Sequence, residues 1–228
     1  VISNLSNIPL LLKLMSVCPI TDLRLEKLLV KIRAKILTSI KDLVNYPQVL
    51  KFQSALALQC FTNEYIYNKT NEEEKYLALL EKTVKKELDN GNNPNPEKIL
   101  CLASYKPLNQ YEWSSLLIVN NDIKDVFRRQ IIEPFEENNL KKIIPSLNHI
   151  KDNVSLKVRD QYESSPYPRW VNLKLRLKPS PISKIISQNN LKIFYHKIKD
   201  LDAPNILIAG CGTGQQSIET AARFKNSK

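Results

Sequence analysis

The sequence predicts a mainly α-helical protein that ends in the first strand, turn and helix of an α/β domain. Three observations support this fold class. Apolar residues recur at helical spacing through the first two thirds of the 228 residues. Two proline-marked segments, SSPYPRW and KPSPIS, then interrupt that pattern. Finally, three of the four glycines in the chain stand at alternate positions within one short segment, NILIAGCGTGQQSIETA at 205–221.

Residues 1–150 are expected to form an all-α domain. The clearest amphipathic helix is predicted over 22–43, where leucine and isoleucine recur every three or four residues, and Thr21 is its predicted N-cap. Helices are also expected over 7–17 and 49–65, and shorter ones near 109–118 and 121–132. No internal repeat is visible, so the sequence predicts packed helices and not a solenoid.

Local signals place several helix ends in this domain. Thr70 and Glu73 have the spacing of a capping box at the start of a helix. Gly91 supplies the left-handed residue that ends the same helix. Pro134 and Pro145 are expected to bracket another helix, because proline cannot continue a helix past its first turn.

Residues 151–200 are expected to connect this domain to the next. One more helix is predicted over 154–162 and a polar helix over 182–199. Between them, the two prolines of SSPYPRW force an extended chain. The residues at 170–178 then alternate between apolar and polar, which indicates a β-strand or a short extended linker.

Residues 201–228 are expected to begin an α/β domain. A short buried strand is predicted over 205–209 and a helix over 215–224, with the three glycines as the turn between them, which is the opening of a Rossmann-like unit. Glycine lets a backbone turn tightly and approach a ligand without a side chain. The spacing G-x-G-x-G differs from the dinucleotide pattern, because Gln215 stands where a small residue is needed.

The segment ILIAGCGTGQ, at 206–215, resembles the first motif of the class I S-adenosylmethionine-dependent methyltransferases. VRDQYESSPYPRW, at 158–170, resembles the segment that precedes this motif in a bacterial subgroup often joined to tetratricopeptide repeats. LLLKLMSVCPI and ALALQCFTNEY are similar to the helical part of that subgroup. The resemblance implies that any such repeat domain lies upstream of residue 1.

The resemblance also implies a set of cofactor-binding residues. The glycines would form the turn against the methionine and ribose parts of S-adenosylmethionine, and a glutamine would reach its carboxylate. The implied set is Ala209, Gly210, Cys211, Gly212, Thr213, Gly214, Gln215 and Gln216. Tyr162, Tyr167, Arg169 and Trp170 are expected either to fold over the cofactor or to belong to a connector whose rings pack on the domain. No catalytic residue, methyl acceptor or metal site is predicted.

A Rossmann-like site also needs an acidic residue roughly 20 residues beyond the glycine turn, to bind the ribose hydroxyls. Counting from Gly210 places that residue past Lys228, so we expect a fragment of a methyltransferase that is inactive by itself. Two alternatives stay open. One is a fragment of a nicotinamide-dependent oxidoreductase that uses the same turn. The other is a non-enzymatic helical interaction domain in which the glycine turn is incidental.

Composition limits the partners and the compartment. The net charge is +11, but the lysines are dispersed and do not alternate with aromatic residues, which predicts solvated helix faces and no nucleic-acid partner. No apolar run has the roughly 18–20 residues that a membrane span needs. The four cysteines are far apart in the sequence, which is typical of free thiols in a reducing cytoplasm.

Overall fold

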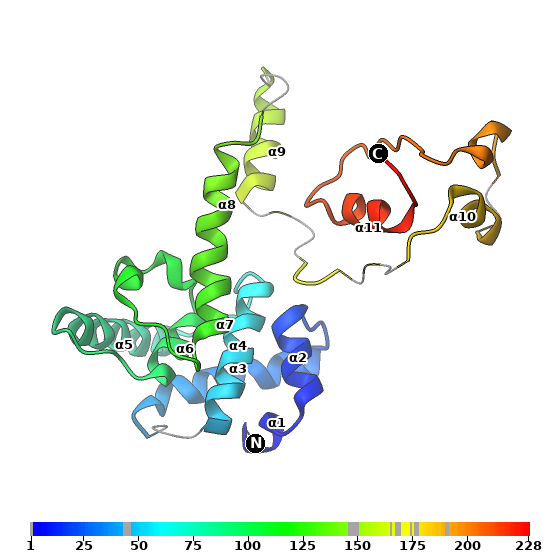
Figure 1. The fold of residues 1–228 in the computed structure, drawn as a ribbon. Coiled ribbons are helices and arrows are strands. Elements are labelled where there is room, and N and C mark those ends of the chain that lie inside the picture. The colour runs from blue at the N-terminus through cyan, green and yellow to red at the C-terminus, as the bar shows by residue number, and fades with distance from the viewer. Residues whose placement is uncertain are drawn as a thin grey trace. The chain divides into compact units, whose positions relative to one another are not determined.

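A computed structural model describes residues 2–42, 47–145, 151–164, 166, 170–173, 175, 178–189 and 192–228. It contains two compact units, 1–147 and 148–228 (Figure 1). Most of the described residues are helical, which confirms the mainly α fold class. Within the described part of the chain, no helix is both long and apolar enough to span a membrane.

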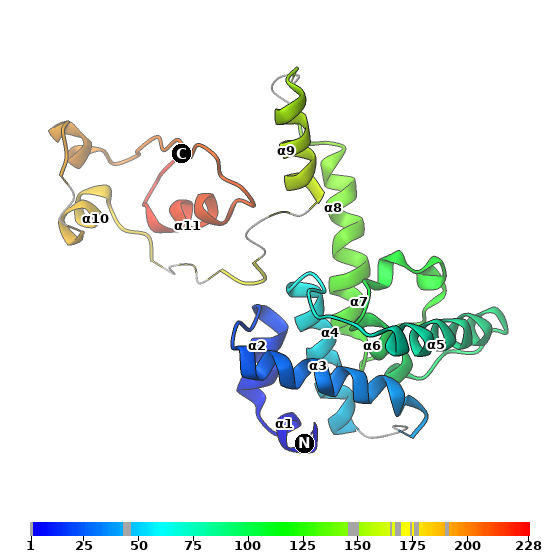
Figure 2. The same ribbon diagram turned by 180° about the vertical axis from the view of Figure 1, so that it is seen from behind.

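The helices of the N-terminal unit pack around α4 (Figure 1). Its elements are α1 (Ile2–Ser6), α2 (Pro9–Val17), α3 (Leu23–Thr38), η1 (Ile40–Asp42), α4 (Pro47–Thr62), α5 (Asn71–Asp89), α6 (Pro96–Ala103), η2 (Leu108–Gln110), η3 (Glu112–Leu116), α7 (Lys124–Phe127), η4 (Arg128–Ile132) and α8 (Glu133–Lys141). Helix α4 contacts α1, α2, α6 and α7, whereas α3 contacts α5 and α6 (Figure 2). Helix α4 is central because it buries side chains such as Phe52, Leu56 and Cys60.

Helix α3 begins one residue later than the sequence indicates. The prediction of Thr21 as N-cap is wrong, because Asp22 caps the helix. Its carboxylate accepts hydrogen bonds from the backbone N–H groups of Arg24 at 3.0 Å and Leu25 at 2.9 Å. A carboxylate suits this position because the helix N-terminus carries partial positive charge.

Both ends of α5 are formed as the sequence predicts. The Thr70 hydroxyl accepts from the Glu73 N–H at 3.2 Å, and the Glu73 carboxylate accepts from the Thr70 N–H at 2.8 Å, which confirms the capping box. Gly91 has a φ of 75°, and its N–H donates to the carbonyl of Leu88 at 2.9 Å. The left-handed glycine therefore ends the helix.

Helix α8 begins at Glu133 with Pro134 in its first turn and ends before Pro145, as the sequence predicts, but Pro134 does not interrupt the helical path of the chain. The chain stays helical from α7 through α8, and the five residues of η4, just before Pro134, form a wider π-helical segment. Proline has no N–H to donate and crowds the carbonyl one turn back, and a widened turn accommodates both effects. The same segment carries the buried Gln130, whose amide reaches backbone groups of other elements.

The C-terminal unit contains α9 (Asn153–Ser164), α10 (Ile182–Gln188), η5 (His196–Asp200) and α11 (Gln215–Arg223). Helices α9 and α11 match their predicted positions. The helix predicted over 182–199 is wrong in its length, because α10 ends at Gln188. In the segment 170–178, the described residues 170–173, 175 and 178 form no strand, and the other residues lie outside the described part.

The predicted strand over 205–209 is not formed as a regular strand, but its first residues are paired. The N–H of Ile206 donates to the carbonyl of Lys228 at 2.9 Å, and the N–H of Lys228 donates to the carbonyl of Pro204 at 3.0 Å. This alternation is the hydrogen-bond pattern of parallel chains. A second parallel bridge joins Ser180 to Phe224. The segments before and after α11 therefore run in the same direction.

The C-terminal unit buries few of its large apolar side chains. Ile185 and Ile186 of α10 are buried. By contrast, Leu207 is 92% exposed, Phe194 is fully exposed, and Ile218 on α11 is 40% exposed. Leu207 and Ile218, on either side of the glycine turn, are thus exposed, whereas Ile206 and Ile208 are half-buried.

Candidate functional site

The glycine turn is the candidate site, and all three of its glycines are left-handed. The backbone φ angles are 67° at Gly210, 53° at Gly212 and 79° at Gly214. Residues with a Cβ rarely adopt such angles, so the conformation explains why glycine stands at each position. The N–H of Gly214 donates to the carbonyl of Cys211 at 2.9 Å, which closes the turn.

Space is available beside the turn. A Cβ built on Gly210 or Gly214 would meet no atom within 4 Å. The left-handed φ angle, and not crowding by neighbouring atoms, therefore explains why glycine stands at these two positions. Residues 209–212 are exposed, whereas Thr213, Gly214 and Gln215 are half-buried. The bare backbone of the turn is therefore open to a ligand.

The turn leads directly into the N-terminus of α11. Gly214 is the N-cap, and its carbonyl accepts from the N–H of Ile218 at 3.0 Å. Among the described residues, no side chain caps this helix end. The N–H groups of the first helical turn have no partner inside a helix, and the helix dipole favours negative charge beside them. This geometry suits an anionic group.

The two predicted glutamines of the site differ in their surroundings. Gln215 donates from its side-chain nitrogen to the Glu219 carboxylate at 3.3 Å, one turn along α11. Gln216 is exposed. Gln216 is therefore the more accessible of the two side chains for a ligand.

Among the described residues of the connector, Trp170 contacts the turn, and it is one of the aromatic residues expected to fold over the cofactor or to pack on the domain. The indole Nε1 of Trp170 donates to the hydroxyl of Thr213 at 3.1 Å and to its carbonyl at 3.3 Å. The signal that could have found this contact is an indole N–H placed just after a proline-stiffened segment, which needs an acceptor once the ring is covered. Tyr162 of the predicted set is 63% exposed. Tyr167 and Arg169 lie outside the described residues.

Cys211 in the turn is a free, exposed cysteine. Cys60 and Cys101 in the N-terminal unit are buried, and burial raises the pKa of each thiol to about 12. In the part of the chain that the structure covers, no cluster of histidine, cysteine and acidic residues could hold a metal ion. Cys211 is thus the accessible thiol of the candidate site.

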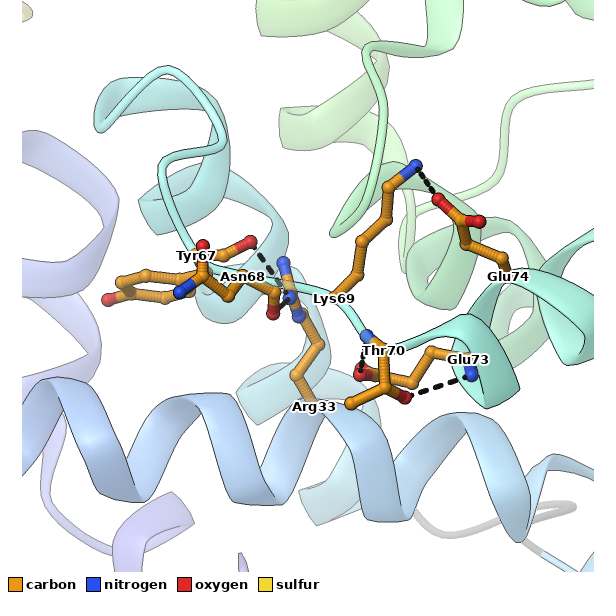
Figure 3. Close-up of polar contacts among 7 residues, drawn as sticks. All are labelled: Arg33, Tyr67, Asn68, Lys69, Thr70, Glu73 and Glu74. Atoms are coloured by element: carbon orange, nitrogen blue, oxygen red, sulfur yellow. Dashed lines mark hydrogen bonds and ion pairs between the residues drawn. The ribbon is translucent and has the colours of Figure 1, made fainter.

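A second polar cluster lies inside the N-terminal unit, around Arg33 of α3 (Figure 3). The guanidinium donates to the carbonyls of Asn68 at 2.7 Å, Tyr67 at 3.2 Å and Ser104 at 3.4 Å. Its Cζ atom also lies 4.1 Å from the ring centroid of Tyr105. Arg33 therefore joins α3, the segment after α4 and the end of α6.

The same cluster contains the capping box of α5. The Tyr105 hydroxyl donates to the Glu73 carboxylate at 2.6 Å. Burial acts to raise the pKa of Glu73, but the hydrogen bonds from Tyr105 and Thr70, with the charge of Arg33, outweigh it and hold the pKa below its ordinary value. Burial and the bond to Glu73 raise the pKa of Tyr105. Glu73 is thus ionised where it meets Arg33 and Tyr105.

Sequence reasoning missed the Arg33 cluster because Arg33 stands between Lys31 and Lys35 in a charged stretch that reads as a helix surface. Arg33 is only 1% exposed, so it cannot reach a ligand in solution. Its guanidinium donates to three backbone carbonyls of its own unit. The cluster therefore organises the helical domain, and the glycine turn remains the candidate binding site.

Comparison of the chain with known protein families, curated proteins and solved structures finds no match. The residues of the turn therefore provide the evidence on its function. Those residues provide an exposed backbone, a helix N-terminus without a side-chain cap and one indole contact from the connector.

Proposed function

We propose that residues 201–228 supply the cofactor turn of a class I S-adenosylmethionine-dependent methyltransferase. The observation that carries the proposal is the conformation of Gly210, Gly212 and Gly214. All three are left-handed, and they lead from a segment in parallel pairing with Lys228 into the N-terminus of α11. A turn between a strand and a helix, built from bare backbone, is the means by which α/β folds hold nucleotide-like cofactors.

The parallel pairing supports this assignment. Ile206 precedes the turn, and Lys228 follows α11, and their backbones bond as neighbouring parallel chains do. A helix that connects two parallel chains is the connection of a βαβ unit. One pairing of this kind is the smallest piece of such a unit, so it supports the resemblance without completing a sheet.

The residues of the turn fit the cofactor. The carboxylate of its methionine part would be placed against the first N–H groups of α11, where the helix dipole favours negative charge. Gly210 and Gly212 are exposed and carry no side chain of their own, which leaves room for the ribose. Gln216 offers an amide near the same helix end. Bound in this way, the cofactor supplies a methyl group on a sulfonium.

The reaction would be a direct displacement. The bound cofactor would supply an electrophilic methyl group to an acceptor atom, and the residues of the turn would hold and orient that cofactor. Orienting the two reactants supplies much of the rate in such a step. The role of this chain is to bind and orient the cofactor, and the acceptor and the catalytic residues stay unassigned.

The exposed apolar side chains suggest that the turn belongs to a larger domain. Leu207 lies beside the turn and Ile218 on the helix after it, and both are exposed within residues 148–228. In an α/β domain, such side chains pack between the sheet and its helices. We therefore propose that residues 1–228 alone bind the cofactor weakly and that strong binding needs the full-length gene product. The free buried thiols of the chain fit a cytoplasmic location.

A nicotinamide dinucleotide is the less favoured ligand. Dinucleotide turns need a small third residue so that the helix packs closely on its strand, and Gln215 occupies that position. Calorimetry can compare both ligands on the full-length gene product. We expect S-adenosylmethionine to bind with micromolar affinity and a dinucleotide to bind at least about tenfold more weakly, a difference of about 1.4 kcal/mol.

A matched pair of variants makes the test specific. Gly212→Leu places a branched side chain on the turn, and we expect it to abolish binding of S-adenosylmethionine. Gly91→Leu makes the same change at another left-handed glycine, at the end of α5, and should leave the affinity unchanged. Tight dinucleotide binding, or equal losses in both variants, would contradict the proposal.

A further inference from the structure

Among the described residues, Trp170 of the connector contacts the glycine turn at Thr213. Trp170 lies 43 residues before Thr213, and its indole nitrogen donates to both acceptors of that residue, the hydroxyl and the carbonyl. Thr213 stands between Gly212 and Gly214, in the middle of the turn. The contact therefore acts on the part of the turn with the greatest backbone freedom.

The geometry of one peptide unit shows what the contact does. The carbonyl of Thr213 and the N–H of Gly214 belong to the same planar group, so they can only rotate together. Trp170 holds the carbonyl side of this plane at 3.3 Å, and the carbonyl of Cys211 holds the N–H side at 2.9 Å. The plane is thus fixed at both edges.

Orientation of this plane matters for a ligand. It immediately precedes α11, whose first N–H groups face the space beside the turn. Glycine-rich segments lose much conformational entropy when they are ordered, and a contact that orders them before binding reduces the cost of binding. An external hydrogen-bond donor is a direct way to provide this order.

We propose that Trp170 is a positioning residue that fixes the Thr213–Gly214 peptide and so sets the affinity of the turn for its cofactor. The inference rests on the proposed function, since it takes S-adenosylmethionine as the ligand. It adds the connector to the binding machinery, which the glycine motif alone does not include.

The test uses variants that change the donor at Trp170 or the acceptors at Thr213 and little else. Trp170→Phe keeps an aromatic ring but has no N–H. Thr213→Val removes the hydroxyl and keeps the carbonyl, whereas Thr213→Ser keeps both acceptors. Trp113→Phe is the matched control, because Trp113 is the other tryptophan of the chain and is buried in the N-terminal unit.

The first readout is amide hydrogen exchange of Gly214 in residues 1–228, measured by NMR, which needs no ligand. We expect Trp170→Phe to speed this exchange about fivefold, the effect of losing one hydrogen bond, and Trp113→Phe and Thr213→Ser to leave it unchanged. Thr213→Val should have an intermediate effect. Equal exchange in Trp170→Phe and the wild type would overturn the inference.

The second readout is the dissociation constant of S-adenosylmethionine in the full-length gene product. We expect it to rise about fivefold in Trp170→Phe and to be unchanged in Trp113→Phe. If the wild type binds the cofactor and Trp170→Phe binds it equally well, the inference fails and the proposed function stands. If the wild type does not bind it, the proposed function fails, and the inference fails with it.

Discussion

The guanidinium of Arg33 lies over the ring of Tyr105, with 4.1 Å between Cζ and the ring centroid. Tyr105 in turn donates to Glu73, so three elements of the N-terminal unit meet at one buried cation. Two neighbouring residues in the chain after α4, Glu64 and Tyr65, have positive φ angles of 58°. This left-handed turn brings the chain back so that the carbonyls of Tyr67 and Asn68 face the guanidinium.

Removing the Arg33 charge should destabilise the N-terminal unit strongly. Arg33→Met keeps an unbranched chain in the core but leaves three backbone carbonyls without their donor, at an expected cost of about 3–5 kcal/mol in the free energy of unfolding. Urea unfolding followed by Trp113 fluorescence, in a Trp170→Phe background, measures this cost. Arg24→Met is the control, since the Arg24 side chain is 94% exposed, and it should change stability little. Equal effects of the two variants would contradict the role of Arg33.

Glu73 should make the stability of the same unit depend on pH. Its pKa in the folded state is depressed from 4.5, so its ionised form stabilises the fold above that value, and this contribution is lost as the pH falls below 4.5 and through the folded pKa. Glu73→Gln should therefore lose less stability than the wild type between pH 5 and acid conditions, as checked by urea unfolding across that range. Glu72→Gln, at an exposed neighbouring residue, should keep the wild-type dependence of the free energy of unfolding on pH. If the free energy of unfolding depends on pH equally in the two variants, the stabilising role of ionised Glu73 would be refuted.

The left-handed backbone at Gly214 should be the only barrier to substitution there, because no atom lies within 4 Å of a Cβ at this position. Gly214→Ala should cost about 1–2 kcal/mol, the strain of a left-handed alanine. Gly214→Asn should cost less, because asparagine adopts this region more readily. Amide exchange of Ile218, which bonds to the Gly214 carbonyl, reports the change. Similar exchange in the alanine and asparagine variants would show that φ does not control the site.

Thiol reactivity should distinguish Cys211 in the turn from the two buried cysteines of the N-terminal unit. Iodoacetamide at pH 8 should label the exposed Cys211 quickly and leave Cys60 and Cys101 unmodified, since burial raises their pKa values to about 12. In the full-length gene product, S-adenosylmethionine should slow labelling of Cys211 about tenfold while labelling of Cys18, far from the turn in sequence, is unchanged. Mass spectrometry of the labelled peptides gives both rates. If saturating cofactor leaves the rate of Cys211 labelling unchanged, that result would argue against binding at the turn.

Sequence patterns predicted the parts of the fold that depend on local chemistry. The spacing of Thr70 and Glu73 predicted a capping box, and Gly91 predicted the end of the same helix, because each signal acts within a few residues. Thr21 was wrongly preferred over Asp22 because both residues suit an N-cap and only the backbone decides between them. The start of α8 at Pro134 was predictable, but the π-helical segment that keeps the chain helical before it was not.

Long-range contacts could not be predicted in this way. Arg33 has the sequence signature of a surface cation, and only the packing of α3 against α6 shows that it is buried. The indole of Trp170 signals that it needs an acceptor, but no local signal identifies Thr213 as that acceptor. The segment 205–209 reads as a strand, but a strand needs neighbours, and the described residues supply a single pairing with Lys228. The glycine turn itself was predictable because its conformation is a property of its own residues.

The most direct test of the central claim is ultraviolet cross-linking of labelled S-adenosylmethionine to the full-length gene product, followed by tryptic digestion. Residues 200–223 contain no lysine or arginine before Arg223, so the entire glycine turn lies on one tryptic peptide. We predict that this peptide carries the label and that excess S-adenosylhomocysteine, but not a nicotinamide dinucleotide, prevents labelling. Absence of label from this peptide, or its displacement by the dinucleotide, would contradict a methyltransferase cofactor site at Gly210, Gly212 and Gly214.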